Sequence, residues 1–263
     1  MNLVSAELFK RLEDAKQERH DLWEGMMNQS ATPFSSAKGR KILFLGDSMS
    51  EDLYISSIER QKTTQDHSQY KRLKLDDACF RFLDSAHMSA LQDPSCKQQI
   101  ESFINSDLLK NSTDIVIANL WEPTNVGTIS KFLSLKQIEE KNIILYAAPT
   151  FTDMTSLLYY LSKSEQTSHD PGFMNFIYRN RNERRISINT TIEAVASKYQ
   201  TSFINAFDFY CSDINKTCNL FDGNGVPWII DGMHLSPNGI QYFSPWLAEK
   251  LILTPPVQAI KSN

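Results

Sequence analysis

The sequence predicts an α/β fold, a three-layer α/β/α sandwich built on about five parallel strands. Short apolar runs alternate along the chain with longer amphipathic stretches, as expected for a parallel sheet that helices cover on both faces. The runs lack the polar alternation of a half-exposed strand. A helix-like segment precedes them, so we expect one domain with an N-terminal helical extension.

Each predicted strand is a short run rich in Ile, Val, Leu, Phe or Tyr, and the second run is weak. The predicted strands are 41–46, 70–75, 114–120, 142–148 and 202–207. The predicted helices are 51–60, 97–107, 133–141, 153–164, 180–199 and 237–251. The last helix has a defined start, because Ser236 is a good N-cap and Pro237 fits the first helical position.

The N-terminal part of the chain differs from the rest. Residues 3–28 carry spaced leucines and Trp23 among charged neighbours, a helical pattern with a modest apolar face. Residues 28–40 are polar and rich in Ser, which indicates a connector. We therefore divide the chain into an extension and linker, 1–38, and a domain, 39–263, that carries the sheet.

Composition narrows the possible functions. The 263 residues are 41% hydrophobic and carry a net charge of −4, which allows a sizeable core and gives no indication of nucleic acid or anionic membrane as partner. No apolar run approaches the roughly 20 residues of a membrane helix, and the first residues lack the apolar block of a secretory leader. Metal-ligand clusters and Gly-rich phosphate loops are also missing, so we expect a soluble chain without a cofactor.

The four cysteines fall into two sequence-local pairs, Cys79 with Cys96 and Cys211 with Cys218. Neither pair has the Cys-x-x-Cys spacing of a zinc ribbon or a thioredoxin-like site. Two loop-closing disulfides are one interpretation, and they would indicate an oxidising compartment. Four unrelated free thiols are the other. Disulfides without a leader would fit an excised domain, or a mature form that lacks its export or membrane segment.

The most informative motif is Gly46-Asp47-Ser48, which ends the first apolar run abruptly. Parallel sheets place their ligand sites at the carboxyl ends of the strands, so Ser48 is expected at such a site. A helix starting here would direct backbone N–H groups at an oxyanion beside Ser48. The alternative is an ordinary turn with Ser48 as the N-cap.

A second motif lies near the C-terminus, where Asp231 precedes His234 by three residues. In a loop of this kind the imidazole can act as a general base while the carboxylate orients it. A surface Asp near a surface His is the alternative. Together with Ser48, the pair has the composition of a nucleophilic acyl-transfer site.

The two motifs together resemble the SGNH/GDSL hydrolase superfamily over about residues 40–252. The fold of that superfamily is a flavodoxin-like α/β/α sandwich. Its serine is the nucleophile, and its Asp-x-x-His supplies the carboxylate and the base. The resemblance therefore implies these roles for Ser48, Asp231 and His234, within an SGNH-like catalytic domain.

The oxyanion hole departs from the superfamily pattern. Its second sequence block has a glycine whose N–H contributes to the hole, but no glycine lies between Gly46 and Gly127. Its third block has an Asn that donates to the oxyanion, and here neither Asn119 nor Asn125 has the standard offset. The resemblance implies the Ser48 N–H as the main donor and Asn119 as a second one.

These departures resemble one branch of the superfamily, the SGNH domains fused or partnered to membrane acyltransferases of the acyltransferase-three family. That branch tends to have a strand ending in Trp, here Trp121, and a Cys-rich loop, here 211–218, before Asp-x-x-His-Leu-Ser-x-x-Gly, here 231–239. The resemblance implies a second disulfide between Cys79 and Cys96. Such domains act outside the cytoplasm on bacterial surface polysaccharides and usually move O-acetyl groups.

The implied function is serine-dependent O-acyl transfer. A sugar hydroxyl as acceptor would make the protein an O-acetyltransferase, and water as acceptor would make it an acetylesterase; the sequence does not separate the two. A non-catalytic carbohydrate-binding or assembly module is the alternative from another class.

Partners and location follow from the same resemblance. The expected partners are a glycan substrate, an acyl donor of unknown identity and a membrane acyltransferase, with no nucleic acid. The periplasm or another extracytoplasmic compartment is the expected location, with the cytoplasm as the alternative.

Other features are weaker. Trp121 and residues 149–151 follow predicted strands at the site edge, where they either shape a substrate groove or pack in the core. The basic clusters 71–74 and 179–185 are interpreted as solvated faces.

Overall fold

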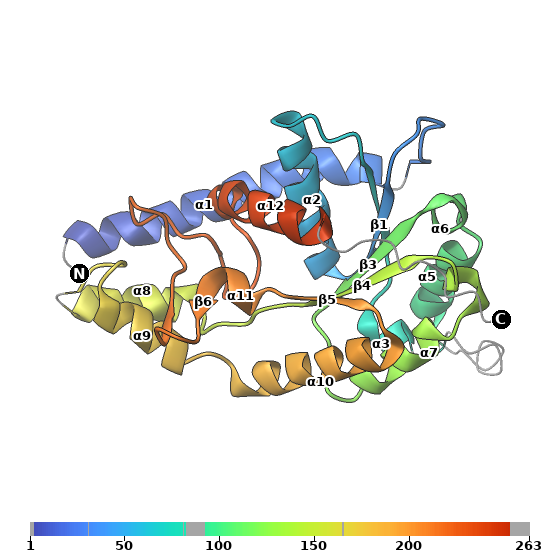
Figure 1. Ribbon diagram of the computed structural model, residues 1–263. Helices are drawn as coiled ribbons and strands as arrows, with labels where there is room; N and C mark the ends of the chain where they lie inside the picture. The colour runs from blue at the N-terminus through green and yellow to red at the C-terminus, as the bar shows by residue number, and fades with distance from the viewer. Residues whose placement is uncertain (1–2, 31, 81, 83–92, 165, 253–263) are drawn as a thin grey trace.

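The computed structural model describes residues 3–30, 32–80, 82, 93–164 and 166–252. Within these residues, five parallel strands form the central sheet in the order β2-β1-β3-β4-β5 (Figure 1). This is the flavodoxin-like order, in which the strand sequence changes direction between β1 and β3 and ligands bind at the carboxyl ends of these two strands. The strands are β1 Lys41–Gly46, β2 Gln69–Lys74, β3 Asp114–Asn119, β4 Asn142–Ala147 and β5 Ser202–Asn205.

All five predicted strands are present, with ends within about two residues of those expected. Strands β3 and β4 are buried at every residue, which explains why the sequence shows unbroken apolar runs there. Strand β2 lies at the edge of the sheet and alternates between buried and partly exposed residues along most of its length. Its sequence signal is weak because only one face packs against the core.

The sheet separates two apolar layers. Along β1, Phe44 packs in one core cluster and Leu45 in the other, because successive side chains point to opposite faces of a strand. Helices α1, α2, α8 and α12 contribute to the first layer, and α5, α7 and α10 contribute to the second. Figure 1 shows α10 across the sheet from α2 and α12. The predicted three-layer sandwich is confirmed.

The helices follow the predicted alternation with some differences. The α-helices are α1 Leu3–Ser30, α2 Ser48–Lys62, α3 Asp77–Phe80, α5 Pro94–Ile104, α6 Asp107–Asn111, α7 Ile129–Leu133, α8 Met154–Lys163, α9 Pro171–Arg179, α10 Glu183–Tyr199, α11 Phe207–Tyr210 and α12 Pro237–Ile252. Two 3₁₀ turns, η1 Val126–Thr128 and η2 Lys136–Ile138, flank α7. The start of α12 is as predicted, since the Ser236 hydroxyl accepts a hydrogen bond from the Gly239 N–H at 2.9 Å.

Three helix predictions differ from the structure: one helix is absent and two have other ends. The predicted helix 133–141 is absent; α7 ends at Leu133 and only the short turn η2 follows. The predicted helix 97–107 ends at Ile104, because Ser106 starts α6 as its N-cap. The predicted helix 180–199 starts at Glu183 behind its N-cap Asn182, and α9 precedes it.

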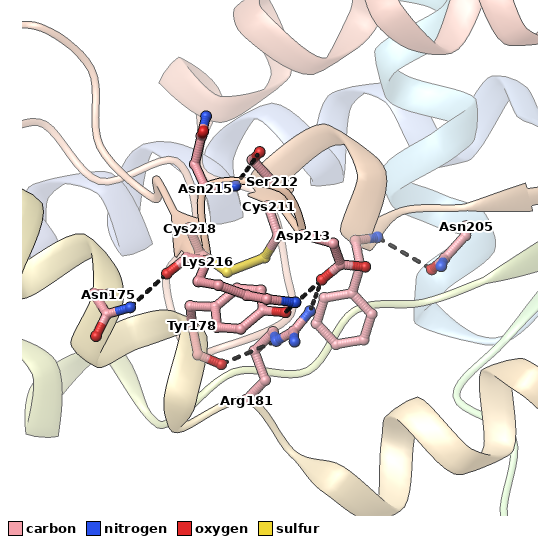
Figure 2. Close-up of a disulfide and its surroundings, with 11 residues drawn as sticks. Asn175, Tyr178, Arg181, Asn205, Cys211, Ser212, Asp213, Asn215, Lys216 and Cys218 are labelled. Atoms are coloured by element: carbon pink, nitrogen blue, oxygen red, sulfur yellow. Dashed lines mark hydrogen bonds and ion pairs between the residues drawn. A yellow bond between two sulfur atoms is a disulfide. The ribbon is translucent and has the colours of Figure 1, made fainter.

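Two disulfides are present, Cys79–Cys96 and Cys211–Cys218, as the resemblance implied. The second joins the short strands β6 Cys211–Ser212 and β7 Thr217–Cys218 of a hairpin. Figure 2 shows this hairpin against the end of α9, where the Tyr178 hydroxyl donates to the Asp213 carboxylate at 2.6 Å. The predicted free-thiol alternative is therefore wrong.

Helix α1 packs on the same side of the sheet as α12 (Figure 1), against α2, α8 and α12. Its Leu12 and Trp23 are buried in the same cluster as Phe44 of β1. Residues 32–40 form neither helix nor strand, as expected of a connector. The extension shares the core of the domain, whose predicted end at 253–263 lies outside the described residues. In the described part of the chain, no helix has the length and apolar character needed to cross a membrane.

Substituting Gly46 tests the close approach of β1 to β3. Gly46 has a φ of +150°, and a Cβ there would lie 1.9 Å from the Ala118 carbonyl oxygen. We expect Gly46→Ala to lower the free energy of unfolding by about 3 kcal/mol or more, since overpacking adds to backbone strain. Gly127→Ala is the control, because a Cβ there meets nothing within 4 Å. Similar denaturant midpoints for both variants would contradict the prediction.

Candidate active site

The turn from β1 into α2 holds the predicted nucleophile. Asp47, not Ser48, is the N-cap of α2, and its carboxylate accepts from the Met49 N–H at 2.8 Å. The same carboxylate accepts from the Leu120 N–H at 2.8 Å, and the Asp47 N–H donates to the Asn119 side-chain oxygen at 2.8 Å. The capping alternative for Ser48 is therefore wrong. Asp47 fastens the turn to the end of β3 and leaves the Ser48 side chain available.

Arg72 of β2 also holds this turn, through hydrogen bonds and an ion pair. Its guanidinium donates to the Ser50 hydroxyl at 2.8 Å and to the Asp47 carbonyl at 3.1 Å, and it pairs with Glu51 at 3.0 Å. Only 8% of Arg72 is exposed. The interpretation of 71–74 as a solvated basic face is wrong at Arg72, because this side chain is buried and binds the turn between β1 and α2.

The second motif lies on a narrow hairpin formed by residues 229–235, which is called the hairpin below. Ile229 and Leu235 form an antiparallel bridge, and the Ile230 N–H donates to the His234 carbonyl at 2.9 Å. Gly232 at its tip has a φ of +97°, and its carbonyl accepts from the Phe151 N–H at 2.8 Å. The loop after β4 therefore anchors the hairpin at its tip and sets the direction of Asp231 and His234.

The structure brings the three predicted side chains together. The distance from Ser48 Oγ to His234 Nε2 is 2.9 Å, and that from His234 Nδ1 to Asp231 Oδ2 is 2.7 Å. The other Asp231 oxygen accepts from the His234 N–H at 2.9 Å and from the Met233 N–H at 3.2 Å. Asp231 is thus held by the main chain of the hairpin, and one ring nitrogen of His234 faces each partner, as general-base activation of a serine requires.

The charges at the site favour the protonated form of His234. Burial opposes that form, but the hydrogen bond to Asp231 and the negative charges of Asp52 and Asp231 outweigh burial and raise the His234 pKa. Burial also opposes the charged form of Asp231, yet the bonds from His234 and from the main chain lower its pKa to about 2. The carboxylate therefore stays ionised and stabilises an imidazolium.

The other predicted site residues, Asn119 and Trp121, lie inside the protein. Asn119 has no exposed surface; its oxygen binds the Asp47 N–H, and its side-chain nitrogen finds no hydrogen-bond partner among the described residues. Trp121 is 1% exposed and packs edge-on against Phe80, with ring centres 5.0 Å apart. Asn125 donates to the Asp77 carboxylate at 3.0 Å. An oxyanion or substrate role for these side chains stays a prediction. In the structure Asn119 and Asn125 make hydrogen bonds within the protein, and Trp121 packs in the core.

The Ser48 N–H, in contrast to Asn119, is available to an oxyanion. It stands at the N-terminus of α2, and it donates to no group in the described part of the chain. The helix dipole adds partial positive charge at this point. An oxyanion beside Ser48 would therefore meet at least one donor.

Phe151 and Arg185 are buried, whereas Arg179 and Arg184 of the cluster 179–185 are exposed. Phe151 is 5% exposed and lies edge-on to Phe207 and Tyr210. Arg185 is 7% exposed and donates to the Trp121 carbonyl at 2.6 Å, so the interpretation of 179–185 as a solvated face is wrong there. Arg185 thereby braces the loop that follows β3.

Sequence reasoning missed two charged residues beside the hairpin, Arg19 and Asp52. Asp52 is 4% exposed, pairs with Arg19 at 2.8 Å and accepts from the Leu235 N–H at 3.0 Å. Asp52 follows Ser48 by four residues, which places both on one face of a helix. That spacing could have identified Asp52, but no pattern in α1 marks Arg19.

The parallel sandwich with a serine, a histidine and an aspartate at its carboxyl edge defines an SGNH hydrolase-type domain. The sequence matches the family described as "SGNH domain (fused to AT3 domains)" over residues 16–249. The chain belongs to this family, and the predictions of an SGNH-type enzyme domain and of the AT3-associated branch are confirmed at that level. None of the curated proteins compared with the chain matches it significantly.

A solved structure shows the same fold, and a second is more loosely similar. The periplasmic domain of a lipopolysaccharide acetyltransferase from Salmonella ser. Paratyphi A aligns with a TM-score of 0.63 and 15% identity, covering 94% of this chain and 99% of that one. A carbohydrate acetylesterase from Sinorhizobium meliloti aligns with a TM-score of 0.46 and 16% identity, covering 82% and 99%. The first likeness establishes the fold alone, and the second is too loose to carry a conclusion.

The hydrogen bond between Asp231 and His234 predicts a measurable pKa. We expect NMR titration of the His234 ring to give a value above 6.5 in the wild type and a lower value in Asp231→Asn, since that variant loses a charge and weakens the bond. Asp107→Asn, which removes an exposed carboxylate of α6, is the control. An unchanged His234 pKa in Asp231→Asn would show that the bond does not exist in solution.

Proposed function

We propose that the protein catalyses serine-dependent transfer of O-acyl groups, O-acetyl in the first place, on bacterial surface polysaccharide. Ser48 is the nucleophile, His234 the general base and Asp231 the residue that orients it. The contact between Ser48 Oγ and His234 Nε2 at 2.9 Å carries this proposal. We further propose that residues 39–263 hold the reacting groups and that 1–38 support them.

In the first half-reaction His234 accepts the Ser48 proton at Nε2 while Oγ attacks the acyl carbonyl carbon. The carbonyl π electrons move to oxygen and form a tetrahedral oxyanion. The Ser48 N–H and the α2 dipole stabilise the oxyanion. The intermediate collapses as the donor oxygen leaves with the proton from His234, and acyl-Ser48 remains.

The second half-reaction repeats these steps with another acceptor. His234 removes a proton from the acceptor hydroxyl, whose oxygen attacks the acyl-Ser48 carbonyl. The new ester forms, and Oγ leaves with the proton from Nε2. Asp231 stays ionised throughout, because its pKa of about 2 lies well below that of the imidazolium.

A sugar hydroxyl as acceptor makes the protein an O-acetyltransferase, which is our leading proposal. Acetylesterase activity is the second candidate, because the Asp231 side chain is 43% exposed and the site is open to water. A purely carbohydrate-binding module would gain nothing from aligned hydrogen bonds from Asp231 through His234 to Ser48.

We infer an extracytoplasmic location, in the periplasm or beyond. Two disulfides favour an oxidising compartment, and the Salmonella structure is described as a periplasmic domain. The family is named for fusion to AT3 domains, so we propose a membrane acyltransferase as the partner that supplies the acyl group.

Ser48→Ala tests the nucleophile. A serine-directed fluorophosphonate should label the wild type, and Ser48→Ala should lose both labelling and hydrolysis of a small aryl acetate, with kcat lower by about 10³-fold or more. Fragmentation of the labelled peptide must place the adduct on Ser48 and not on Ser50, whose buried hydroxyl donates to the Asp47 carbonyl at 2.7 Å. Undiminished hydrolysis by Ser48→Ala would end the proposal.

A second assay distinguishes the two acceptors. The wild type is incubated with an acetyl donor and candidate surface glycans, and NMR follows the acetyl group. We expect it to appear on the sugar faster than as free acetate. Release of acetate alone with every glycan would favour the acetylesterase.

A further inference from the structure

Asp52 is a buried carboxylate beside the site that the steps above do not use. It lies on α2 one helical turn after Ser48, and 4% of it is exposed. Its Oδ2 accepts from the Leu235 N–H at 3.0 Å, and its Oδ1 pairs with Arg19 Nη2 at 2.8 Å. A buried carboxylate requires such partners to remain charged.

Arg19 comes from the N-terminal helix α1 and completes the same arrangement. Its Nε donates to the Leu235 carbonyl at 3.1 Å, so the ion pair satisfies both main-chain groups of the residue that follows His234. The guanidinium lies over the Trp23 ring, 4.1 Å from its centre. Trp23 thereby limits the directions that the Arg19 side chain can take.

The pair reaches the reacting groups through His234. The ring of His234 contacts Ser48 on one side, and its backbone continues directly into Leu235. A displacement of Leu235 would move the ring away from Ser48 Oγ, and about 1 Å of misplacement can cost about 10²-fold in rate. The hairpin is therefore held at its tip by Phe151 and at its C-terminal end by Arg19 and Asp52.

We propose that Arg19 and Asp52 are positioning residues for His234 and that helix α1 is thereby part of the active site. This inference rests on the proposed function. Arg19 favours the charged form of Asp52, Asp52 and Arg19 hold Leu235, and Leu235 sets the distance from His234 to Ser48.

The charge of Asp52 also acts on His234. Burial raises the Asp52 pKa, and Arg19 and the Leu235 N–H oppose that rise. Other titratable groups that face Asp52 are Arg72 of β2, Tyr146 of β4 and Tyr210 of α11. Facing His234 are Asp231, Asp52 and Arg19, and the charge of Asp52 is among the causes that raise the His234 pKa.

Kinetics of Arg19→Met provide the first test. We expect kcat for an aryl acetate to fall about 10- to 100-fold while KM stays within about 2-fold, because geometry is lost and substrate contacts are not. Arg19→Lys should recover part of kcat, since lysine can pair with Asp52 but lacks the fork that also reaches Leu235. Arg11→Met is the matched control. Arg11 lies on the same helix, but it donates to the Asn224 carbonyl at 2.6 Å, outside the hairpin that carries His234. We therefore expect an unchanged kcat.

Asp52→Asn gives a second readout that needs no activity. We expect NMR titration to show a lower His234 pKa than in the wild type, and the acidic limb of kcat/KM to move to lower pH. A wild-type kcat in Arg19→Met, or a wild-type His234 pKa in Asp52→Asn, would overturn the inference. If the fluorophosphonate does not label Ser48 of the wild type, the proposed function is contradicted instead. The NMR titration of His234 would still test the inference in that case.

Discussion

The position of Ser48 depends on how closely β1 approaches β3 at Gly46. A side chain at residue 46 would collide with the Ala118 carbonyl, so the two strands can meet here only through glycine. This contact brings Asp47 to the end of β3, where its carboxylate joins the start of α2 to the Leu120 N–H. The nucleophile thus lies on a turn that is bonded to two strands and a helix.

The partner of Ser48 is held by parts of the chain that are far apart in sequence. The loop after β4 binds the tip of the hairpin through Phe151, and α1 and α2 hold its C-terminal end through Arg19 and Asp52. Each contact uses a main-chain group of the hairpin. The geometry of His234 therefore depends on how α1 and the loop after β4 pack on the domain.

Stability and activity are favoured at different pH values. His234 has a raised pKa and Asp231 a lowered one. The His234 contribution to stability is fully present below its usual value of about 6.5 and is lost as pH rises through the higher folded value. The Asp231 contribution is present above about 4 and is lost as pH falls through about 2. Both contributions are therefore fully present between about pH 4 and 6.5, whereas general-base catalysis requires the neutral imidazole at higher pH.

The parallel sheet could be predicted from the amino-acid sequence, because β1, β3 and β4 are buried on both faces and so appear as unbroken apolar runs. The sequence also indicated Ser48, Asp231 and His234, since each follows a short apolar segment in a local motif. The contacts of Arg19, Asp52 and Arg72 became apparent only in the folded chain. Their partners lie in distant segments, and the charge of a side chain does not reveal whether a folded chain will bury it.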